Sequence, residues 1–324
     1  MNHDGAGVTT DVSRAAARAN GAGSASELTA IISAFDRVPR AISESEFRRF
    51  QELIYREAGI WLSQAKAALL VGRLAKRLRH HRLHSYKDYY QLVVESPEER
   101  IQMLDAVSTN ETHFFREPRH FELLHTTIFP RWAEEAAQGR RRRIRVWSAG
   151  CSTGQEPYSL AMTLLDHFPA GSGWEIEIVA TDISTRALEI ARQAVFPMAI
   201  AREIPNAYLK AFMLKGIREQ ADLMKAGPDI RAAVRFFRLN LNDDSYPFQG
   251  HFDLIFCRNV LIYFDRESRG RVTGRLLEHL SPQGYLFVGH AESLHEMNGK
   301  VRSVIPTVYT PMPKAGAEHN ATAR

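Results

Sequence analysis

The sequence has little of what a secreted or membrane-spanning protein requires. Its 324 residues include only two cysteines, Cys151 and Cys257, which form no disulfide framework and lack the spacing of metal ligands. No apolar run approaches the roughly 20 residues that span a bilayer. Residues 1–26 contain no continuous apolar segment of the signal-peptide type. These absences predict a protein of the reducing cytoplasm, without membrane insertion and without a metal site.

The dinucleotide-binding fingerprint G-x-G-x-x-G is also missing. Between Arg143 and Met162 a strand-like run leads through a small-residue loop into a helix, but this loop holds only Gly150 and Gly154. A pyrophosphate binds at a helix N-terminus, where the carboxylate of Glu156 would repel it. A cofactor with an ammonium and a sulfonium, such as S-adenosylmethionine, would be attracted instead. Alternatively, Glu156 only complements the helix dipole, for about 0.3 to 1 kcal/mol.

What the chain does contain is typical of a globular protein, with 44% hydrophobic and 24% charged residues. Residues 1–42, rich in Gly, Ala, Ser and Thr, are expected to form a disordered leader. Residues 43–118 contain four helical patterns with short links, the first opening on capping residues. This segment is therefore predicted to be a small all-α domain.

Residues 119–313 alternate between strand-like and helical patterns, which predicts an α/β fold with a doubly wound, mostly parallel, Rossmann-like sheet. Residues 197–233 break this rhythm and are expected to be a small insertion, and residues 314–324 a flexible tail. The expected strands lie at 144–150, 175–183, 234–241, 252–259, 284–290 and 303–311.

Polar side chains follow three of these strands, at the edge where doubly wound sheets bind ligands. They are the loop that ends in Glu156, then Asp182, and then Asn259 with Tyr263. A carboxylate after the second strand accepts hydrogen bonds from ribose hydroxyls, which suits an adenosine-bearing ligand. The pattern alone leaves open whether that ligand is NAD or S-adenosylmethionine.

Four segments together resemble the CheR family of chemotaxis receptor methyltransferases. They are "NETHFFREPRHF" (110–121), "RVWSAGCSTGQEPYSLAM" (145–162), "ATDIS" (180–184) and "FDLIFCRNVLIYFD" (252–265). Their order and spacing match the family over about residues 43 to 312. The resemblance implies the fold of S-adenosylmethionine-dependent methyltransferases, with S-adenosylhomocysteine as the product. It implies methylation of glutamate side chains on the cytoplasmic helices of chemoreceptors, giving glutamyl methyl esters for sensory adaptation.

The resemblance also assigns site residues. Asp182 would hold the ribose, Asn240 and Leu241 would flank the adenine, and Arg116 would hold the methionyl carboxylate. Tyr263 would lie near the transferable methyl, with Arg131 as a second orienting residue at the reaction centre. The remaining residues expected at the cofactor are Asn110, Thr112, Glu156, Asn259 and Val260.

Two features bear on the protein partner. The stretch 72–87 is basic, and Arg73, Lys76, Arg77 and Arg79 are expected to dock acidic receptor helices, the alternative being a solvated helix face. The insertion lacks the Gly-rich loop of family members that bind a receptor's C-terminal pentapeptide. We therefore expect no dependence on that pentapeptide. We also expect a monomer that is recruited to receptor arrays.

Two other functions remain open from the sequence. A nucleic-acid methyltransferase would use the same fold and the net charge of +5, but the [DN]-P-P-[FYW] stretch of base amino methylases is replaced by "CRNVLIYF". The second is a non-catalytic cofactor-sensing or scaffold protein built on this fold, and the retained set of Arg116, Glu156, Asp182, Asn259 and Tyr263 argues against lost binding. We therefore expect no nucleic-acid partner and an active enzyme.

Overall fold

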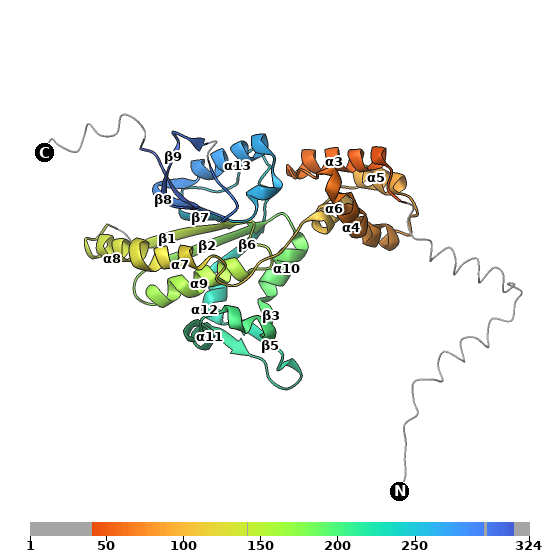
Figure 1. Cartoon of the computed structure of the whole chain (residues 1–324). Coiled ribbons are helices and arrows are strands. Elements are labelled where there is room, and N and C mark those ends of the chain that lie inside the picture. The colour runs from red at the N-terminus through yellow and green to blue at the C-terminus, as the bar shows by residue number, and fades with distance from the viewer. Residues whose placement is uncertain (1–40, 141, 295–296, 314–324) are drawn as a thin grey trace, which may run out of the picture.

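The computed structural model describes residues 41–140, 142–294 and 297–313 (Figure 1). The expected leader, apart from residues 41 and 42, and the expected tail at 314–324 lie outside the described residues. None of the helices within these described ranges is long and apolar enough to cross a membrane.

A bundle of helices forms the first part of the chain. It contains α3 (Glu44–Ala58), the short η1 (Gln64–Lys66), α4 (Ala67–His80), α5 (Tyr86–Glu95) and α6 (Pro97–Val107). Ser43 and Glu46 form a capping box that starts α3, and Gly59 ends it in a left-handed conformation. Serines also cap α5 and α6. Phe50, Leu74 and Tyr89 are among the apolar side chains that fill the core of the bundle.

A polar network lies within this bundle. The Glu99 carboxylate, 5% exposed, accepts hydrogen bonds from Arg77 Nε at 2.9 Å and from the Tyr89 hydroxyl at 2.7 Å, and it contacts His81 Nε2 at 2.7 Å. Burial alone would raise the pKa of Glu99, but the hydrogen bonds from Arg77, Tyr89 and His81 lower it overall. Glu99 is thus held as an anion inside the bundle.

A seven-stranded sheet forms the second part. Its order is β6-β2-β1-β7-β8-β10-β9, parallel from β6 through β8 and antiparallel at β10 and β9. The strands are β1 (Arg143–Ala149), β2 (Glu175–Asp182), β6 (Val234–Arg238), β7 (Phe252–Cys257), β8 (Leu280–Val288), β9 (Val301–Ile305) and β10 (Val308–Pro311). The expected mostly parallel α/β fold is confirmed.

Helices cover both faces of this sheet (Figure 1). On one face, α8 (Phe129–Ala137), α9 (Gln155–His167) and α10 (Thr185–Gln193) pack onto a core that includes Trp132, Leu160 and Leu188. On the other, α13 (Arg266–Glu278) packs onto a core built around Trp147. Two short helices lead directly into α8. They are α7 (Pro118–Leu123) and the π-helical η2 (Leu124–Ile128).

The last expected strand, 303–311, is in fact a hairpin. Residues 301–305 form β9 and 308–311 form β10, which pair antiparallel around Pro306 and Thr307. Thr307 adopts a left-handed backbone (φ 69°), which turns the chain. An apolar run with β-branched residues on both sides of a proline does not show this turn by periodicity alone.

The insertion forms a small sheet of its own below the main one (Figure 1). β3 (Val195–Pro197), β5 (Leu223–Ala226) and β4 (Met213–Lys215) pair antiparallel in the order β3-β5-β4. The links are η3 (Met198–Glu203), α11 (Asn206–Phe212) and η4 (Arg218–Gln220), and α12 (Pro228–Ala232) leads back to β6.

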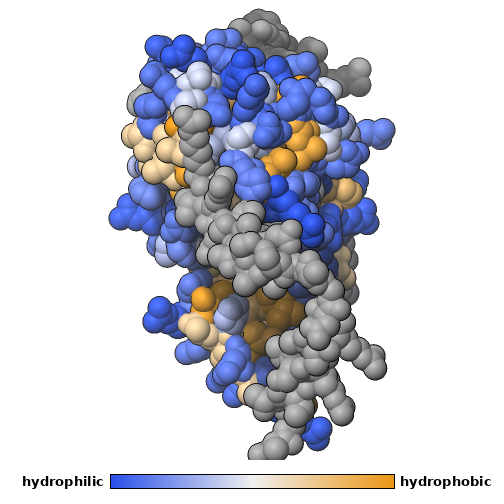
Figure 2. Space-filling model, turned by 90° about the vertical axis from the view of Figure 1, so that its right-hand side faces the viewer, coloured by the Kyte–Doolittle hydropathy of each residue, from blue (hydrophilic) through white to orange (hydrophobic). Residues whose placement is uncertain are grey.

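The side of the molecule in Figure 2 is mostly hydrophilic, with apolar residues gathered in separate areas.

Candidate functional site

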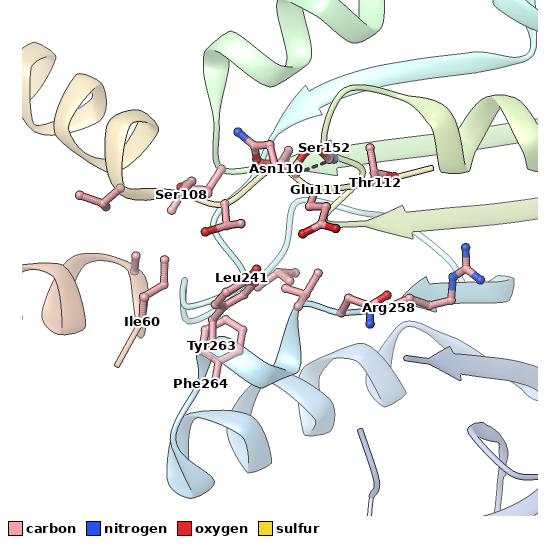
Figure 3. A pocket seen from close by; sticks show the side chains of 18 of the residues that line it. Ile60, Ser108, Asn110, Glu111, Thr112, Ser152, Leu241, Arg258, Tyr263 and Phe264 are labelled. Atoms are coloured by element: carbon pink, nitrogen blue, oxygen red, sulfur yellow. Dashed lines mark hydrogen bonds between the residues drawn. The ribbon is translucent and has the colours of Figure 1, made fainter. Parts of the chain in front are cut away.

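An open cavity lies where the C-terminal ends of β1, β2, β6 and β7 meet the helical bundle (Figure 3). Its wall comes from the end of α3, the start of α4, the segment 107–116, and the loops that follow these strands. All nine residues expected at the cofactor line it together with Tyr263. The nine are Asn110, Thr112, Arg116, Glu156, Asp182, Asn240, Leu241, Asn259 and Val260.

The loop after β1 forms one wall of this cavity. Gly150 has a positive φ (85°), and an added Cβ there would lie 2.4 Å from Val260 Cγ2. Gly154 also has a positive φ, and a Cβ there would lie 3.0 Å from the Cβ of Ala191. The glycines therefore allow this loop to pack against the loop after β7 and against α10.

Glu156, in the first turn of α9, does not present a free negative charge. Its Oε2 accepts a hydrogen bond from Arg258 Nε at 2.7 Å, and its Oε1 accepts one from the Ser148 hydroxyl at 2.6 Å. The side chain of Arg258 is 2% exposed and that of Glu156 9%. The sequence argument that a carboxylate here attracts a cationic cofactor is weakened, because Arg258 compensates the charge.

Arg258 also connects this pair to the segment between the domains. Its Nη1 donates to the carbonyl oxygen of Arg116 and lies 3.3 Å from His120 Nδ1. Burial, together with the nearby Arg258 cation, lowers the pKa of His120 to about 4. The neutral imidazole can therefore accept from Arg258 while its Nε2 contacts Thr307 Oγ1 at 2.8 Å.

Asp182, the last residue of β2, is buried beside the cavity. Its Oδ2 accepts from the backbone N–H of Ser152 at 2.7 Å, and its Oδ1 from that of Ser184 at 2.9 Å. Burial raises the pKa of Asp182 despite these hydrogen bonds. A carboxylate has about four acceptor positions, so Asp182 keeps capacity for further donors.

Glu292 organises the loop after β7. Its carboxylate accepts from the backbone N–H groups of Asn259 (2.9 Å), Ile262 (3.1 Å) and Gly289 (2.5 Å). Asn259 adopts a left-handed backbone (φ 59°), and its side-chain Oδ1 is buried without a hydrogen-bond partner among the described residues. An unpartnered buried acceptor in a cavity wall is what a bound ligand with N–H or O–H groups would satisfy.

The segment 108–116 crosses between the domains along the cavity, and Figure 3 shows Asn110, Glu111 and Thr112 on it. The Ser152 hydroxyl donates to the carbonyl oxygen of Asn110 at 3.0 Å, which ties this segment to the loop after β1. The Arg116 guanidinium makes one hydrogen bond within the described chain, to the carbonyl oxygen of Glu111 at 3.3 Å. Most of its five N–H donors are therefore available to an anion.

Hydrogen bonds join the helical bundle to the loops after β6 and β7, on the side of the cavity formed by the bundle. Asn240 Nδ2 donates to the carbonyl oxygen of Glu57 at 2.6 Å, and the Tyr55 hydroxyl donates to Asp265 Oδ2 at 2.9 Å. Tyr263 lies in η5 (Leu261–Tyr263), where its carbonyl oxygen accepts from the N–H of Trp61 at 2.9 Å. The bundle is thus fixed over the carboxyl edge of the sheet.

The structure does not bring Arg131 to this cavity, and we withdraw it as a reaction-centre residue. It lies on α8, where its Nη1 donates to the Tyr285 hydroxyl at 2.9 Å and its Nε faces Glu135 at 3.4 Å. Arg77 is also a poor docking residue, because it is paired with Glu99 inside the bundle. Arg73 lines the cavity, whereas Lys76 and Arg79 are exposed on α4.

Sequence reasoning missed three residues of the site. Arg258 and Glu292 order the loops as described, and Lys66 lines the cavity with its Nζ 5.9 Å from the centroid of the Tyr263 ring. Arg258 stands directly before Asn259 in a quoted motif, so its position was a usable signal. Glu292 and Lys66 lie outside the motifs, and their roles depend on contacts between segments distant in sequence.

Comparison with known proteins supports one family. The family model described as "CheR methyltransferase, all-alpha domain" matches residues 45–108, and "CheR methyltransferase, SAM binding domain" matches residues 110–310. The chain is 38% identical over 269 residues to chemotaxis protein methyltransferase 2 of Pseudomonas aeruginosa, covering 83% of this chain and 94% of that protein. It is 35% identical over 272 residues to the chemotaxis protein methyltransferase of Escherichia coli K12, covering 83% and 91%.

Solved structures are more distant. The glycopeptide N-methyltransferase MtfA in complex with S-adenosylmethionine is 17% identical, covers 49% of this chain and 53% of its own, and has a TM-score of 0.28. A likeness this low supports no conclusion about the site, so the assignment rests on the sequence relatives and the two family domains. This chain belongs to the CheR methyltransferase family and is an S-adenosylmethionine-dependent methyltransferase.

Proposed function

We propose that this enzyme methylates glutamate side chains in the cytoplasmic domains of chemoreceptors, forming glutamyl methyl esters for sensory adaptation. The observation that carries the proposal is the cavity, where residues from separate segments expected at the cofactor lie together with Tyr263. The names of the relatives, chemotaxis protein methyltransferases, support the pathway. A reaction on these receptor domains places the enzyme in the cytoplasm.

The polar groups of the cavity fit S-adenosylmethionine. Asp182 retains acceptor positions for ribose hydroxyls, and Arg116 has donors in a fork that matches a carboxylate. The buried Oδ1 of Asn259 needs a donor. Asn240 and Leu241 are assigned to the adenine. The side-chain NH₂ of Asn240 already donates a hydrogen bond to the carbonyl oxygen of Glu57. We assign the rest of the cofactor wall to Asn110, Thr112, Glu156 and Val260.

Positioning is the main catalytic task. S-adenosylmethionine, when bound, supplies an electrophilic methyl group on a sulfonium. A glutamate side chain, with an ordinary pKa near 4.3, is already ionised at neutral pH, so no general base is needed. Its oxygen forms the new C–O bond as the C–S bond breaks. Alignment alone can contribute about 7 to 11 kcal/mol.

Tyr263 is our candidate for orienting the glutamate. It lines the cavity, and its hydroxyl has no hydrogen-bond partner among the residues that the structure describes. We expect the hydroxyl to donate to the substrate carboxylate, so Tyr263→Phe should lower kcat while leaving the affinity for S-adenosylhomocysteine unchanged. Full kcat in that variant would remove Tyr263 from this role.

The partner surface is proposed to include α4. Lys76 and Arg79 are exposed there, and Arg73 lies at the cavity, so an acidic receptor helix would find positive charge beside the site. We further propose a monomeric enzyme that is recruited to receptor arrays without requiring a C-terminal receptor pentapeptide. A receptor fragment truncated at its C-terminus should be methylated at the same rate as the full cytoplasmic domain.

The deciding experiment is a transfer assay with methyl-labelled S-adenosylmethionine and candidate receptor cytoplasmic domains. Base-labile label in the receptor, lost when the accepting glutamates are replaced by alanine, would support the proposal. Label in RNA or DNA would favour a nucleic-acid methyltransferase instead. Binding of S-adenosylhomocysteine without label in any acceptor would favour a cofactor sensor.

A further inference from the structure

A threonine in the turn of the β9–β10 hairpin adopts a backbone conformation that its own side chain disfavours. Thr307 has a φ of 69°, and a positive φ is a genuine outlier for a β-branched residue. Glycine adopts the same conformation without steric cost. Backbone strain persists where the surroundings fix a residue, and it gathers at functional sites. We therefore expect the Thr307 side chain to make a contact that offsets this cost.

The Thr307 hydroxyl is fixed in direction by two contacts. It donates a hydrogen bond to the Pro306 carbonyl oxygen at 2.5 Å, and its oxygen lies 2.8 Å from His120 Nε2. Because the hydroxyl hydrogen is directed to Pro306, the oxygen is left to accept, and we assign the proton of the neutral imidazole to Nε2. His120 is 2% exposed, and its ring meets the Phe287 ring edge-on with centroids 5.2 Å apart. The hairpin turn therefore sets the tautomer of a buried histidine.

The other ring nitrogen of His120 faces Arg258. With the proton on Nε2, Nδ1 is an acceptor, and Arg258 Nη1 lies 3.3 Å from it. Glu117 Oε2 lies 3.4 Å from the same nitrogen, but a carboxylate only accepts hydrogen bonds. The Glu117 carboxylate instead accepts from the His290 backbone N–H at 3.0 Å. Arg258 is thus the donor to His120.

Arg258 extends this path to two residues assigned to the cofactor. Its Nη1 also donates to the Arg116 carbonyl oxygen, and its Nε donates to Glu156 Oε2 at 2.7 Å. All three residues line the cavity, and Figure 3 shows Arg258 there. A guanidinium is a rigid planar fork, so a contact that holds one of its nitrogens also directs the others. A continuous path of hydrogen bonds therefore runs from the hairpin turn to the cofactor cavity.

We propose that Thr307 and His120 are positioning residues for the cofactor site. The Thr307 hydroxyl orients the His120 ring, and His120 in turn holds the Arg258 guanidinium. That guanidinium places Arg116 and Glu156 for S-adenosylmethionine. A site that is held in its binding geometry beforehand loses less free energy to ordering when the ligand arrives. The inference goes beyond the proposed function, because it concerns the cofactor and not the methyl acceptor, and it rests on the assignment of Arg116 and Glu156 to the cofactor.

Three substitutions of Thr307 separate its hydroxyl from its backbone strain. Thr307→Ser keeps the hydroxyl. Thr307→Val keeps the shape and the strain but has no hydroxyl, and Thr307→Gly has neither hydroxyl nor strain. The matched control is Ser303→Ala, which removes a hydroxyl of the same hairpin that bonds the Ile305 carbonyl oxygen. Calorimetry measures the affinity of the full chain for S-adenosylhomocysteine, and thermal unfolding measures its Tm, so the test needs no receptor.

We expect the affinity to follow the hydroxyl. Thr307→Val and Thr307→Gly should both bind S-adenosylhomocysteine about three- to tenfold more weakly, the scale of one neutral hydrogen bond. Thr307→Ser and Ser303→Ala should bind it like the wild type. Tm should instead follow the backbone, so that Thr307→Gly unfolds at a higher temperature than Thr307→Val. A threonine with a merely structural role would give affinities and Tm values in the same order.

A double-mutant cycle tests the path through His120. His120→Asn leaves no ring nitrogen for Thr307 to contact, so His120→Asn/Thr307→Val should bind no more weakly than His120→Asn alone. Additive losses in this cycle would overturn the proposal, as would wild-type affinity in Thr307→Val or in Thr307→Gly. Wild-type affinity in Arg116→Ala would overturn the cofactor assignment and this inference with it. Absence of methyl ester on every receptor would overturn the proposed function alone.

Discussion

Glu156 and Arg258 form a buried ion pair across the cavity wall, with Oε2 and Nε 2.7 Å apart. They lie at the starts of two different segments, the helix after β1 and the loop after β7, which meet because β1 and β7 are neighbours in the sheet. The Ser148 hydroxyl donates a further hydrogen bond to Glu156, and Arg258 donates one to the carbonyl oxygen of Arg116. The pair thus holds together three of the segments that line the cavity.

Removing one member of this pair should cost more than removing both. Arg258→Leu leaves the Glu156 carboxylate buried and unpaired, and we expect the free energy of unfolding to fall by about 3 to 5 kcal/mol. The double variant Glu156→Gln/Arg258→Leu has no buried charge there and should lose less. Urea denaturation measures both. If the loss in the double variant equals the sum of the losses in Arg258→Leu and in Glu156→Gln, the two residues are not coupled.

Cofactor binding should weaken in acid through Asp182. Burial raises the pKa of this carboxyl, so it protonates at a higher pH than an ordinary aspartate and then accepts fewer hydrogen bonds. Because the folded-state pKa is raised, protonation does not itself destabilise the fold: the contribution of Asp182 to stability is lost as pH rises through that pKa. Acid should therefore reduce S-adenosylhomocysteine affinity while this residue leaves folding intact.

Calorimetry from neutral to acidic pH would measure that loss, with thermal unfolding as the check on the fold. The matched variant is Asp182→Asn, which cannot titrate. We expect its affinity to be about 10- to 100-fold lower at neutral pH, as for a lost hydrogen bond to a charged group, and to change little with pH. If Asp182→Asn shows the same acid dependence as the wild type, another group is responsible.

Many of the residues expected at the cofactor came from the family resemblance. The architecture and the polar residues at the carboxyl edge of the sheet could be predicted for one physical reason. Parallel strands bring their carboxyl ends to the same edge, so Glu156, Asp182 and Asn259 meet although 103 residues separate the first from the last. Serine caps and alternating patterns set the elements locally. The hairpin of β9 and β10 was not predicted, because its turn depends on the positive φ of Thr307, a residue that rarely adopts it.

What could not be predicted depends on contacts between segments. A helical stripe at 73 and 77 suggested one basic surface, but Arg77 points to Glu99 on another helix, which the spacing on α4 cannot show. Arg131 had no motif around it, and its partner Tyr285 comes from β8. Glu292 follows β8 and reaches back to Asn259, a contact set by the loop and not by periodicity.

Glu292→Gln should loosen the loop after β7. The carboxylate accepts from three backbone N–H groups, whereas a glutamine has one oxygen and turns an NH₂ group toward one of these donors. We expect a loss of about 1 to 3 kcal/mol in the free energy of unfolding and weaker S-adenosylhomocysteine binding. Glu278→Gln, an exposed change on α13, is the control. Unchanged binding in Glu292→Gln would separate this loop from the cofactor site.

Arg77 and Arg79 should respond differently to alanine substitution although they lie two residues apart on α4. Arg77 is paired with the buried Glu99, so Arg77→Ala should lower the free energy of unfolding by about 1 to 3 kcal/mol, allowing for its partial exposure. Arg79 is exposed, so Arg79→Ala should leave stability unchanged and raise only the KM for the receptor, more strongly at low salt.

The acid dependence of unfolding gives a second readout for this pair. The folded-state pKa of Glu99 is lowered, so its stabilisation is present above the ordinary glutamate pKa and is lost as pH falls through the lowered value. Urea unfolding should therefore show a smaller loss of stability in acid for Arg77→Ala than for the wild type, with Arg79→Ala behaving like the wild type. Equal stability of the two variants at neutral pH would mean that the network around Glu99 does not stabilise the bundle.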